Sequence, residues 1–527
     1  MRILTLLLLT LPQFALGETS YNDWKLNIFS AYQYKTPFAK IPEPYVSIQE
    51  AAKGKENQMH LIHSGIAALY KRLDMIERAQ KNIELEYFIF SSKKKAPKST
   101  ENGDERSSKF ILNKLIDKAL TKVSVRILVD HSLAVFQFDE NHVAAIHREI
   151  KKRGGNPRFF QVRYYNSVDS QFRSHRKLIS IDDTEAITGG RNIEDKYFDL
   201  DHSYNFVDRD IWVKGPVVPI MRSSFDEFWF AGVTVKADVD SLLASAPEEE
   251  ELVVNQFLHM SAADKNLLSK VMSIGKSAYE TSQTHACPKT TFASDKPINS
   301  RLVRWCLESE LLCEENYKES HRVTERAIGQ FIRSLSAGDK LYIDSPYVML
   351  NTRSGNLLKI LTEKKVKLRV FTNSLSSTDA TYAASVFYPN ANKFLSSGIQ
   401  LVVHGSSWRP TPYVAEAEVI TARWGMHAKS HLYGDKGFFV GTYNVDNRSS
   451  FYNTEMGLFC EGSKELNADI KNEMLTLAND IGYNLISRDK ALDAKGREQN
   501  PLGKGGEETQ FLMDVIAHPS KLLQFLM

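Results

Sequence analysis

The sequence lacks an excess of charge of either sign. Its 527 residues include 67 Lys plus Arg against 64 Asp plus Glu, a formal net charge of +3. It also has no basic stripe interleaved with aromatic residues, so neither feature favours nucleic acid as a partner. Apolar residues are not scarce. They make up 42% of the chain, enough for a sizeable core, and the length fits two to four ordinary domains or one large duplicated unit.

Apolar runs long enough to cross a bilayer are absent beyond the N-terminus. The first 17 residues, MRILTLLLLTLPQFALG, carry one Arg, a short apolar run and a small-x-small ending at Ala15 and Gly17. This pattern is typical of a secretory signal peptide cleaved near Glu18. The run is short for a membrane span, although an uncleaved anchor is the alternative. We therefore expect an exported protein, periplasmic or secreted, that is peripheral on a membrane if it contacts one.

Cysteines are few. Cys287, Cys306, Cys313 and Cys460 form no CxxC pair, so a structural zinc site is not expected. Export permits disulfides, and we predict a bridge among the first three, which lie in one region. Cys460 ends the apolar run GLFC and is predicted to pack as a buried thiol. The sequence also lacks HExxH and acidic metal clusters, so we expect no metal and no cofactor.

The order of expected elements occurs twice. Each half has a strand-like run, an amphipathic helical run, a second strand and a His-x-Lys segment with a Gly-rich turn. Strands that alternate with helices predict an α/β fold of two similar halves, with mixed sheets flanked by helices. The expected division is a signal peptide 1–17, a first half 18–245, an irregular linker 246–320, a second half 321–485, and a polar tail 486–527 ending in an apolar segment at 511–527 that packs on the body or lies in a membrane interface.

Two copies of one spaced motif stand out. HRKLISID begins at His175 and is followed by GGRN, which ends at Asn192. HAKSHLYGDKGFFVGTYN runs from His427 to Asn444. Each Asn follows its His by 17 positions. A single His on a strand is more often structural, but two copies at identical spacing in two similar halves favour a shared function.

The residue types in the motif suit a phosphate group. On a strand, His-x-Lys puts both side chains on one face, so Lys177 would lie beside His175 and Lys429 beside His427. A Lys ammonium pairs with phosphate oxygens, an Asn amide donates to another, and the Gly pair lets the backbone turn close to a ligand. If the two halves face each other, one imidazole can attack phosphorus while the other protonates the leaving alcohol. The lysines supply the positive charge, so the reaction needs no metal.

Each imidazole needs an acceptor on its other nitrogen. Glu455 lies 28 positions after His427 on a strand-like run, NTEMGLF. The matching run of the first half, 205–215, contains Asp208 and Asp210, of which we prefer Asp208. We therefore expect Glu455 and Asp208 to orient the two histidines.

The doubled HxKxxxxD…GGxN pattern resembles that of the phospholipase D superfamily, and His175, Lys177, Asp182 and Asn192 fit it fully. The stretches RSHRKL, GGRNIEDKYF, DRDIWVKGPVV, LRVFTNSLSSTDA, MHAK and NVDNRSSFYNTEMGL resemble more closely bacterial cardiolipin synthases of this type, over roughly residues 65 to 485. This resemblance implies a bilobal monomer with one active site at the seam.

The resemblance also implies roles. His175 would be the nucleophile and His427 the general acid and base. The protein would work at a membrane surface on a phospholipid, passing its phosphatidyl group to the hydroxyl of another lipid. Three alternatives stay open: hydrolysis to phosphatidic acid with water as the acceptor, a secreted nuclease of the same superfamily, and a non-catalytic lipid-binding protein.

The second motif departs from the pattern at one position. Where it should have an Asp, the chain has Gly434, and Asp435 lies one position on, facing the other side of a strand. The family's Asp supports the motif more than the chemistry, so we expect the loss to affect local geometry first. A shifted turn over Tyr433, Gly434 and Asp435 is one way in which the acceptor could be restored.

Overall fold

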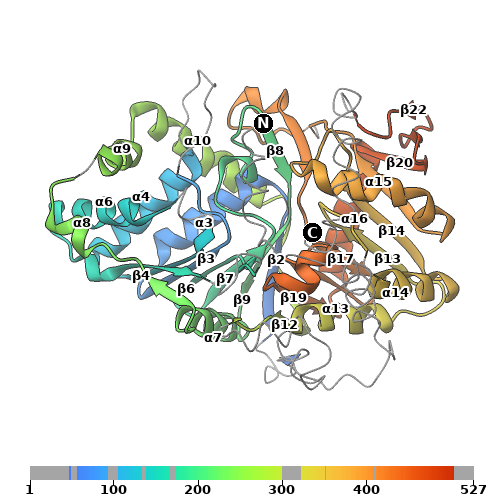
Figure 1. Ribbon diagram of the computed structural model, residues 1–527, viewed down its shortest axis with the longest axis horizontal. Helices are drawn as coiled ribbons and strands as arrows, with labels where there is room; N and C mark the ends of the chain where they lie inside the picture. Colours follow the sequence, from blue (N-terminus) through green and yellow to red (C-terminus); the bar gives the residue numbers. More distant parts are fainter. Residues whose placement is uncertain are drawn as a thin grey trace, which may run out of the picture.

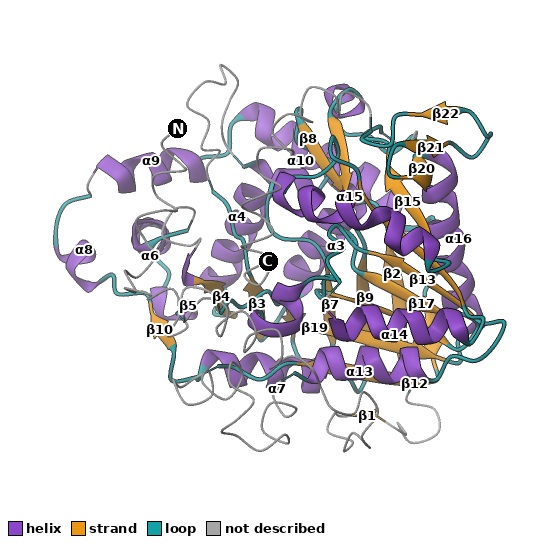
Figure 2. Ribbon diagram, turned by 45° about the vertical axis from the view of Figure 1, so that its right-hand side comes forward, coloured by secondary structure: helices purple, strands orange, loops and turns teal. Residues whose placement is uncertain are grey.

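The computed structural model consists of two α/β halves that lie side by side (Figure 1). Each half is a mixed sheet with helices on its faces (Figure 2), as the repeated order of elements predicts. The structure describes residues 47–48, 56–92, 105–132, 138–166, 172–247, 249–298, 322–350, 352–408 and 411–503. The expected signal peptide, the apolar segment 511–527, Cys306 and Cys313 lie outside these ranges.

The sheet of the first half has parallel strands on one side and antiparallel strands on the other. Helices α3 (Gly65–Arg78), α4 (Arg106–Leu120) and α6 (Glu140–Lys152) pack on one face, and α7 (Val218–Trp229) packs on the other. The strand order is β10 (Thr234–Lys236), β5 (Phe160–Tyr165), β4 (Ser124–Asp130), β3 (Asn82–Tyr87), β6 (Leu178–Ile181), β7 (Glu185–Gly189), β9 (Asp210–Lys214), β2 (Asn57–Ile62) and β11 (His285–Cys287).

The sheet of the second half repeats this plan. Helices α13 (Val323–Arg333), α14 (Thr352–Glu363) and α15 (Thr381–Ser396) pack on one face, and α16 (Lys464–Asp480) packs on the other. The strand order is β1 (Ser47–Ile48), β12 (Lys289–Ser294), β19 (Met456–Glu461), β18 (Gly437–Gly441), β17 (Ser430–Tyr433), β13 (Lys340–Asp344), β14 (Lys367–Asn373), β15 (Gln400–His404), β20 (Gly482–Ser487), β21 (Lys490–Leu492) and β22 (Glu498–Gln499).

The two halves share a block of strands in the same order. Parallel β3, β4 and β5 correspond to β13, β14 and β15, and the antiparallel set β6, β7 and β9 corresponds to β17, β18 and β19. In both copies the His-x-Lys segment leads directly into the central antiparallel strand, β6 or β17. The duplication predicted from the sequence is thereby confirmed.

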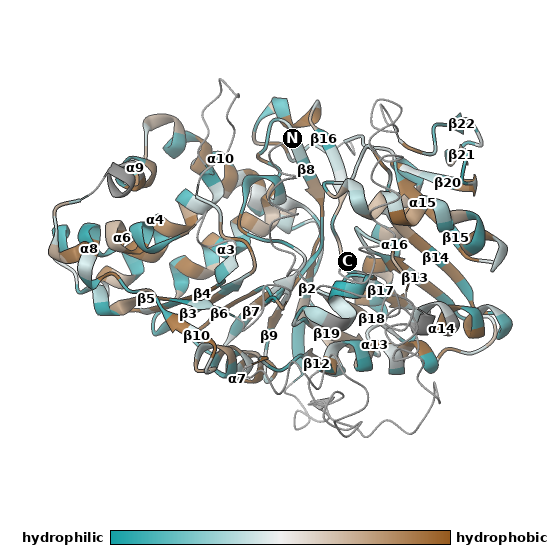
Figure 3. Cartoon of the chain, in the orientation of Figure 1, coloured by the Kyte–Doolittle hydropathy of each residue, from teal (hydrophilic) through white to brown (hydrophobic). Residues whose placement is uncertain are grey.

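Local sequence explains the main elements. Strands β6 and β17 are buried along their whole length because sheet neighbours and helices cover both faces, and Figure 3 colours inner strands such as β9 and β14 as hydrophobic. Helix α3 begins after Ser64, whose side chain accepts from a backbone N–H of the first turn. Asp139 caps α6 in the same way. In each half, apolar helix faces and inner strands together form the core.

The segment 246–320, which we expected to be an irregular linker, contains regular structure where it is described. Helix α9 (Glu249–Leu258) and the 18-residue α10 (Ala262–Tyr279) belong to the first half, and α10 packs along α3. Strand β11 then joins the first sheet and β12 joins the second. The acidic run at its start thus opens a helix, where negative charge is favoured by the helix dipole.

The halves are joined by backbone pairing and by a disulfide. Strands β8 (Tyr204–Val207) and β16 (Arg423–Met426) pair in parallel across the seam. Cys287 on β11 is bonded to Cys460 on β19. This corrects the predictions for these two residues: Cys287 does not pair with Cys306 or Cys313, and Cys460 is not a buried thiol. A bridge between Cys306 and Cys313, which lie outside the described residues, stays a prediction. Cys287 and Cys460 are 173 positions apart in sequence, and only the fold brings them together.

The disulfide closes a long loop, so its loss is expected to destabilise the protein. Changing Cys287 and Cys460 to alanine together should lower the free energy of unfolding by about 2–5 kcal/mol, because the unfolded chain regains the entropy that the cross-link removes. Denaturant titration of both proteins measures the difference, with the reduced wild type as a control that should match the variant. Equal midpoints for the oxidised wild type and the variant would contradict the assignment.

Within the described ranges, none of the helices is both long and apolar enough to cross a membrane.

Candidate active site at the seam

The two His-x-Lys segments meet where the halves face each other. His175 and Lys177 precede β6 in extended chain, and His427 and Lys429 precede β17, so both segments lie just before the strands on which we expected them. All four side chains are buried. Arg176, between the first pair, points away into a buried ion pair with Glu86, with a 2.8 Å Nε–Oε1 distance.

Each histidine is held by a carboxylate from the other half. The Nδ1 atom of His175 lies 3.0 and 3.1 Å from the carboxylate oxygens of Glu455, and Nδ1 of His427 lies 2.7 Å from Asp208. From the sequence we expected each carboxylate to contact the histidine of its own half. In the structure each contacts the histidine of the other half. With Nδ1–H donated to a carboxylate, the Nε2 lone pair of His175 is left for chemistry, and the Nε2 atom of His427 lies 3.1 Å from the Nζ atom of Lys429.

The exchange follows the approximate two-fold of the molecule. Gly189 pairs with Asp210 in the first sheet, and Gly441 pairs with Gly457 in the second. Asp208 and Glu455 each lie two positions before these paired residues of β9 and β19, so they occupy equivalent places.

Backbone hydrogen bonds repeat the exchange. The N–H of His175 donates to the carbonyl of Thr454 at 3.0 Å, and the N–H of His427 donates to that of Val207 at 2.8 Å. Thr454 and Val207 are the residues just before Glu455 and Asp208. The ring and the backbone N–H of each histidine are therefore held by two consecutive residues of the opposite half.

The two carboxylates have different surroundings. Glu455 accepts from Thr442, from Ser449 at 2.7 Å and from Asn453, yet burial raises its pKa to about 7. Burial also opposes ionisation of Asp208, but His427 and Lys429 outweigh it and hold the pKa of Asp208 well below its usual value.

Gly190 lies against Asp208. A Cβ at this position would be 2.1 Å from a carboxylate oxygen of Asp208, which explains why the motif has glycine there.

Both histidines are neutral at pH 7. Burial lowers the pKa of His175 well below 6.5, helped by the charges of Lys177 and Lys429. Burial and Lys429 lower the pKa of His427 to about 3. The influence of Lys429 on His175 places the two motifs within one electrostatic environment, because charges screened by solvent or far apart would not interact.

The lysines are also shifted. Burial and the charge of Lys429 lower the pKa of Lys177 to about 7, and burial lowers that of Lys429 to about 8. The Nζ atom of Lys177 donates to the carbonyl of His175 at 2.7 Å, and that of Lys429 donates to the carbonyl of His427 at 2.6 Å. The charge of Lys429 disfavours the charged form of Lys177, and an anion would offset both charges, so the site suits a negative ligand.

These shifts predict a pH-dependent affinity for anions. Lys177 and Lys429 are charged below pH 7 and lose their protons as the pH rises through 7 to 8. The affinity for dimethyl phosphate, whose single charge does not change in this range, is expected to fall about tenfold or more between pH 6 and 9. Calorimetric titration measures it. The Lys177→Arg variant, whose guanidinium stays charged, should flatten the profile. An affinity that is constant with pH in the wild type would contradict the lysine assignment.

The two asparagines of the motif have different partners. Asn192 accepts from the N–H of Ile89 at 3.2 Å and donates to the hydroxyl of Tyr197 at 3.0 Å. The backbone N–H of Asn444 donates to Ser449 at 3.1 Å. Its buried side-chain oxygen has no hydrogen-bond partner among the described residues.

Sequence reasoning missed several residues of the site. The rings of Tyr197 and Phe206 contact the His427 ring, with centroid distances of 5.0 and 4.7 Å, and Phe88 meets the ring of His175 edge-on. Tyr197 and Ser449 each follow a motif Asn by five positions. That shared spacing was the signal available in the sequence, but the two residue types differ, so it was not visible as a repeat.

Asp182 lies in the turn after β6, with no contact to either histidine. Its carboxylate accepts from the backbone N–H groups of Gln80, Lys81 and Asn82 at 2.7–3.0 Å, and its φ of +52° is in the left-handed region. Asp182 thus fixes the turn that follows β6.

Gly434 occupies the equivalent turn after β17, with a φ of +59°. Glycine adopts this conformation without strain, so the expected disturbance of local geometry is absent. The suggestion that Asp435 restores the acceptor is wrong: its side chain is 97% exposed and its ion-pair contact is Lys471, at 3.9 Å. The second half keeps the turn and loses only the carboxylate.

Comparison with known proteins agrees with the division into two similar halves. Residues 73–229 and 332–477 fit the family model described as "Cardiolipin synthase, PLD-like domain", one match in each half. The chain belongs to this phospholipase D-like family. The resemblance deduced from the doubled motif is therefore confirmed.

Individual relatives are distant. An uncharacterised protein of Helicobacter pylori is 26% identical over 447 residues, covering 80% of this chain and 82% of its own. Cardiolipin synthase C of Escherichia coli is 24% identical over 414 residues, covering 76% and 80%. Among solved structures, the phosphatidylserine synthase of Haemophilus influenzae shares the fold with a TM-score of 0.58 and 13% identity, covering 97% of this chain and all of that one.

Proposed function

We propose that the protein is a phosphatidyltransferase, cardiolipin synthase-like, that acts on phospholipids through a phosphohistidine at His175. The observation that carries this proposal is the crossed arrangement of His175 with Glu455 and His427 with Asp208. It leaves two Nε2 atoms beside two buried lysines, which is what an in-line exchange at a phosphodiester requires.

The first step would break the head-group ester. Neutral His175 attacks phosphorus through Nε2, so an N–P bond forms as the P–O bond of the leaving alcohol breaks. Glu455 stabilises the charge that develops on the ring, and Lys177 and Lys429 bind the phosphoryl oxygens. His427 gives its Nε2 proton to the leaving oxygen. The negative charge of the bound diester offsets the lysine charges and so raises the pKa of His427 toward the range in which it holds that proton.

The second step reverses the proton transfer. An alcohol enters beside His427, which is now neutral, and loses its proton to Nε2. The alcohol oxygen bonds to phosphorus as the N–P bond to His175 breaks. With phosphatidylglycerol as the acceptor the product is cardiolipin, and with water it is phosphatidic acid. The chain contains both halves of the site, so we propose that it acts as a monomer at a membrane surface.

Export is part of the proposal. The Cys287–Cys460 disulfide supports an oxidising compartment, and the pattern of residues 1–17 supports a signal peptide. N-terminal sequencing of the protein purified from its own cells should begin near Glu18.

The experiment that tests the function is lipid chromatography after incubation of the purified protein with phosphatidylglycerol vesicles. Cardiolipin or phosphatidic acid should form with the wild type and be absent with His175→Ala. No new lipid from a folded wild type, on this and on other phospholipid donors, would overturn the proposal. Cleavage of nucleic acid under the same conditions would support the nuclease alternative.

A further inference from the structure

The loop after β14 presents one polar side chain to solvent at the seam. From Phe371 to Ala380 every residue is buried except Asp379, which is exposed. The loop is internally fixed. The Ser377 hydroxyl donates to Asn373 at 2.9 Å, and the N–H of Ala380 donates to Thr378 at 3.0 Å. A carboxylate on a rigid loop is held in place, as a recognition group must be.

The same loop is anchored to the residue before His427. The Asn373 side chain accepts the N–H of Met426 at 2.7 Å and donates to its carbonyl at 2.8 Å. The hydroxyl of Tyr204, from β8 of the first half, donates to the carbonyl of Ser377 at 2.6 Å. Asp379 is therefore positioned with respect to His427 by short, specific contacts from both halves.

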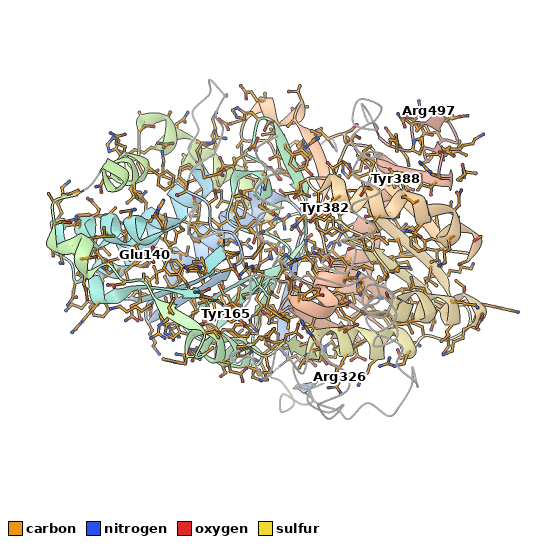
Figure 4. The ribbon with its side chains drawn as sticks, viewed as in Figure 1. Glu140, Tyr165, Arg326, Tyr382, Tyr388 and Arg497 are labelled. Carbon is orange, nitrogen blue, oxygen red and sulfur yellow. A yellow bond between two sulfur atoms is a disulfide. The ribbon has the colours of Figure 1, made fainter. Side chains whose placement is uncertain are left out.

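Asp379 lies beyond the carboxyl ends of the parallel strands β13 and β14. In open α/β sheets ligands bind beyond those ends. The loop after β13 carries Tyr347, whose hydroxyl donates to Asp379 at 2.8 Å. Tyr382, at the start of α15, is 40% exposed and lies at the seam between the halves in Figure 4.

Residues of the first half lie on the other side of the seam from the Asp379 loop. Glu194 and Lys196 form an ion pair at 3.0 Å, and the Lys196 ammonium lies 5.6 Å from the ring centres of both Tyr197 and Phe206. These two rings are the ones that contact His427. Although burial opposes it, the charges of Glu194 and Asp379 raise the pKa of Lys196. The charge of Asp379 also acts on Lys429, whose pKa burial lowers, so the Asp379 carboxylate lies near both lysines.

We infer that Asp379 is the residue that selects the alcohol which leaves and enters beside His427, and that the alcohol is a neutral polyol. This inference rests on the proposed function. The alcohol must lie on the His427 side, because that histidine exchanges its proton in both steps. Asp379 accepts hydrogen bonds from hydroxyls remote from the reacting one, and so aligns the reacting oxygen for attack on phosphorus as the His175 N–P bond breaks.

The charge at the rim decides between a polyol and an amine. Glu194 is already paired with Lys196, and Asp379 lies in the field of Lys196 and Lys429, so the positive charges of these lysines oppose the entry of a cationic head group. Hydroxyl donors remain suitable, because a carboxylate oxygen accepts more than one hydrogen bond and Tyr347 supplies only one of them.

The test measures how the phosphatidyl group is partitioned between an added alcohol and water. Wild type and Asp379→Ala are incubated with phosphatidylglycerol vesicles and either radiolabelled glycerol or radiolabelled ethanolamine. The ratio of labelled phospholipid to phosphatidic acid is then measured. For glycerol we expect the ratio to fall about tenfold or more in the variant, because a hydrogen bond to a charged group is lost. Asp379→Glu should recover part of it.

A matched control is Asp435→Ala, an exposed Asp at the opposite end of β17, which should leave the ratio within twofold of the wild type. An equal ratio in wild type and Asp379→Ala would overturn the inference, as would labelling of the wild-type product by ethanolamine in preference to glycerol. Phosphatidic acid alone with every acceptor would overturn the polyol inference while lipid cleavage stood. No lipid product at all from the wild type would instead be the failure of the proposed function.

Discussion

Replacing His175 with alanine is expected to lower the rate of phosphodiester cleavage at least about 10⁴-fold, because removal of a covalent nucleophile leaves only binding and charge stabilisation. The fold should tolerate the change. His175 lies in extended chain before β6, and its ring contacts Glu455 and the edge of Phe88 without filling an apolar core. The midpoint of thermal unfolding should therefore stay close to that of the wild type.

The measurement is initial-rate assay of head-group release from phosphatidylglycerol vesicles. His259→Ala is the matched control, since His259 is exposed between α9 and α10 in the first half and should retain wild-type activity within twofold. A His175→Ala variant that keeps more than about a hundredth of the rate would contradict the role given to His175.

The second large effect concerns the exchanged carboxylates. Glu455→Gln and Asp208→Asn are each expected to reduce the rate about 10²- to 10⁴-fold, because an amide can turn its N–H₂ toward Nδ1 and stabilise the wrong tautomer of the ring. Each change is nearly isosteric and keeps the local packing. Steady-state rates on the same vesicles measure the loss, and wild-type rates in both variants would contradict the assignment.

Exchange across the halves can be tested separately from activity. In protein with ¹⁵N-labelled histidine, Glu455→Gln should shift the ring-nitrogen resonances of His175 and leave those of His427 in place, and Asp208→Asn should do the reverse. Assignment comes from the His175→Ala and His427→Ala variants. Shifts within the same half, His427 with Glu455, would show that the crossed geometry is wrong.

Much of the fold could be predicted from the sequence because both halves of the chain carry the same order of elements. The strand-helix-strand order and the equal spacing from His175 to Asn192 and from His427 to Asn444 survive the divergence of the two halves. Asp208 and Glu455 were also accessible as site residues, because each precedes a strand that follows a motif. The histidine that each carboxylate contacts could not be predicted, because the sequence carries no signal for contacts between the two halves.

Other features depended on three-dimensional proximity or on backbone conformation. Cys287 and Cys460 lie on edge and inner strands of different sheets, so nearness in sequence pointed to the wrong partners. The second motif seemed incomplete in the sequence because Gly434 stands where the pattern has an Asp. The structure shows instead a turn with positive φ, as at Asp182, which glycine satisfies by its own freedom.

The most direct test of the account is to identify the covalent intermediate. The protein is mixed rapidly with phosphatidylglycerol vesicles, denatured under alkaline conditions that preserve phosphohistidine, digested, and analysed by mass spectrometry. The account predicts a phosphatidyl group on the peptide that contains His175, and none on the peptide that contains His427. An adduct on His427, or sustained turnover with neither peptide modified at any quench time, would contradict it.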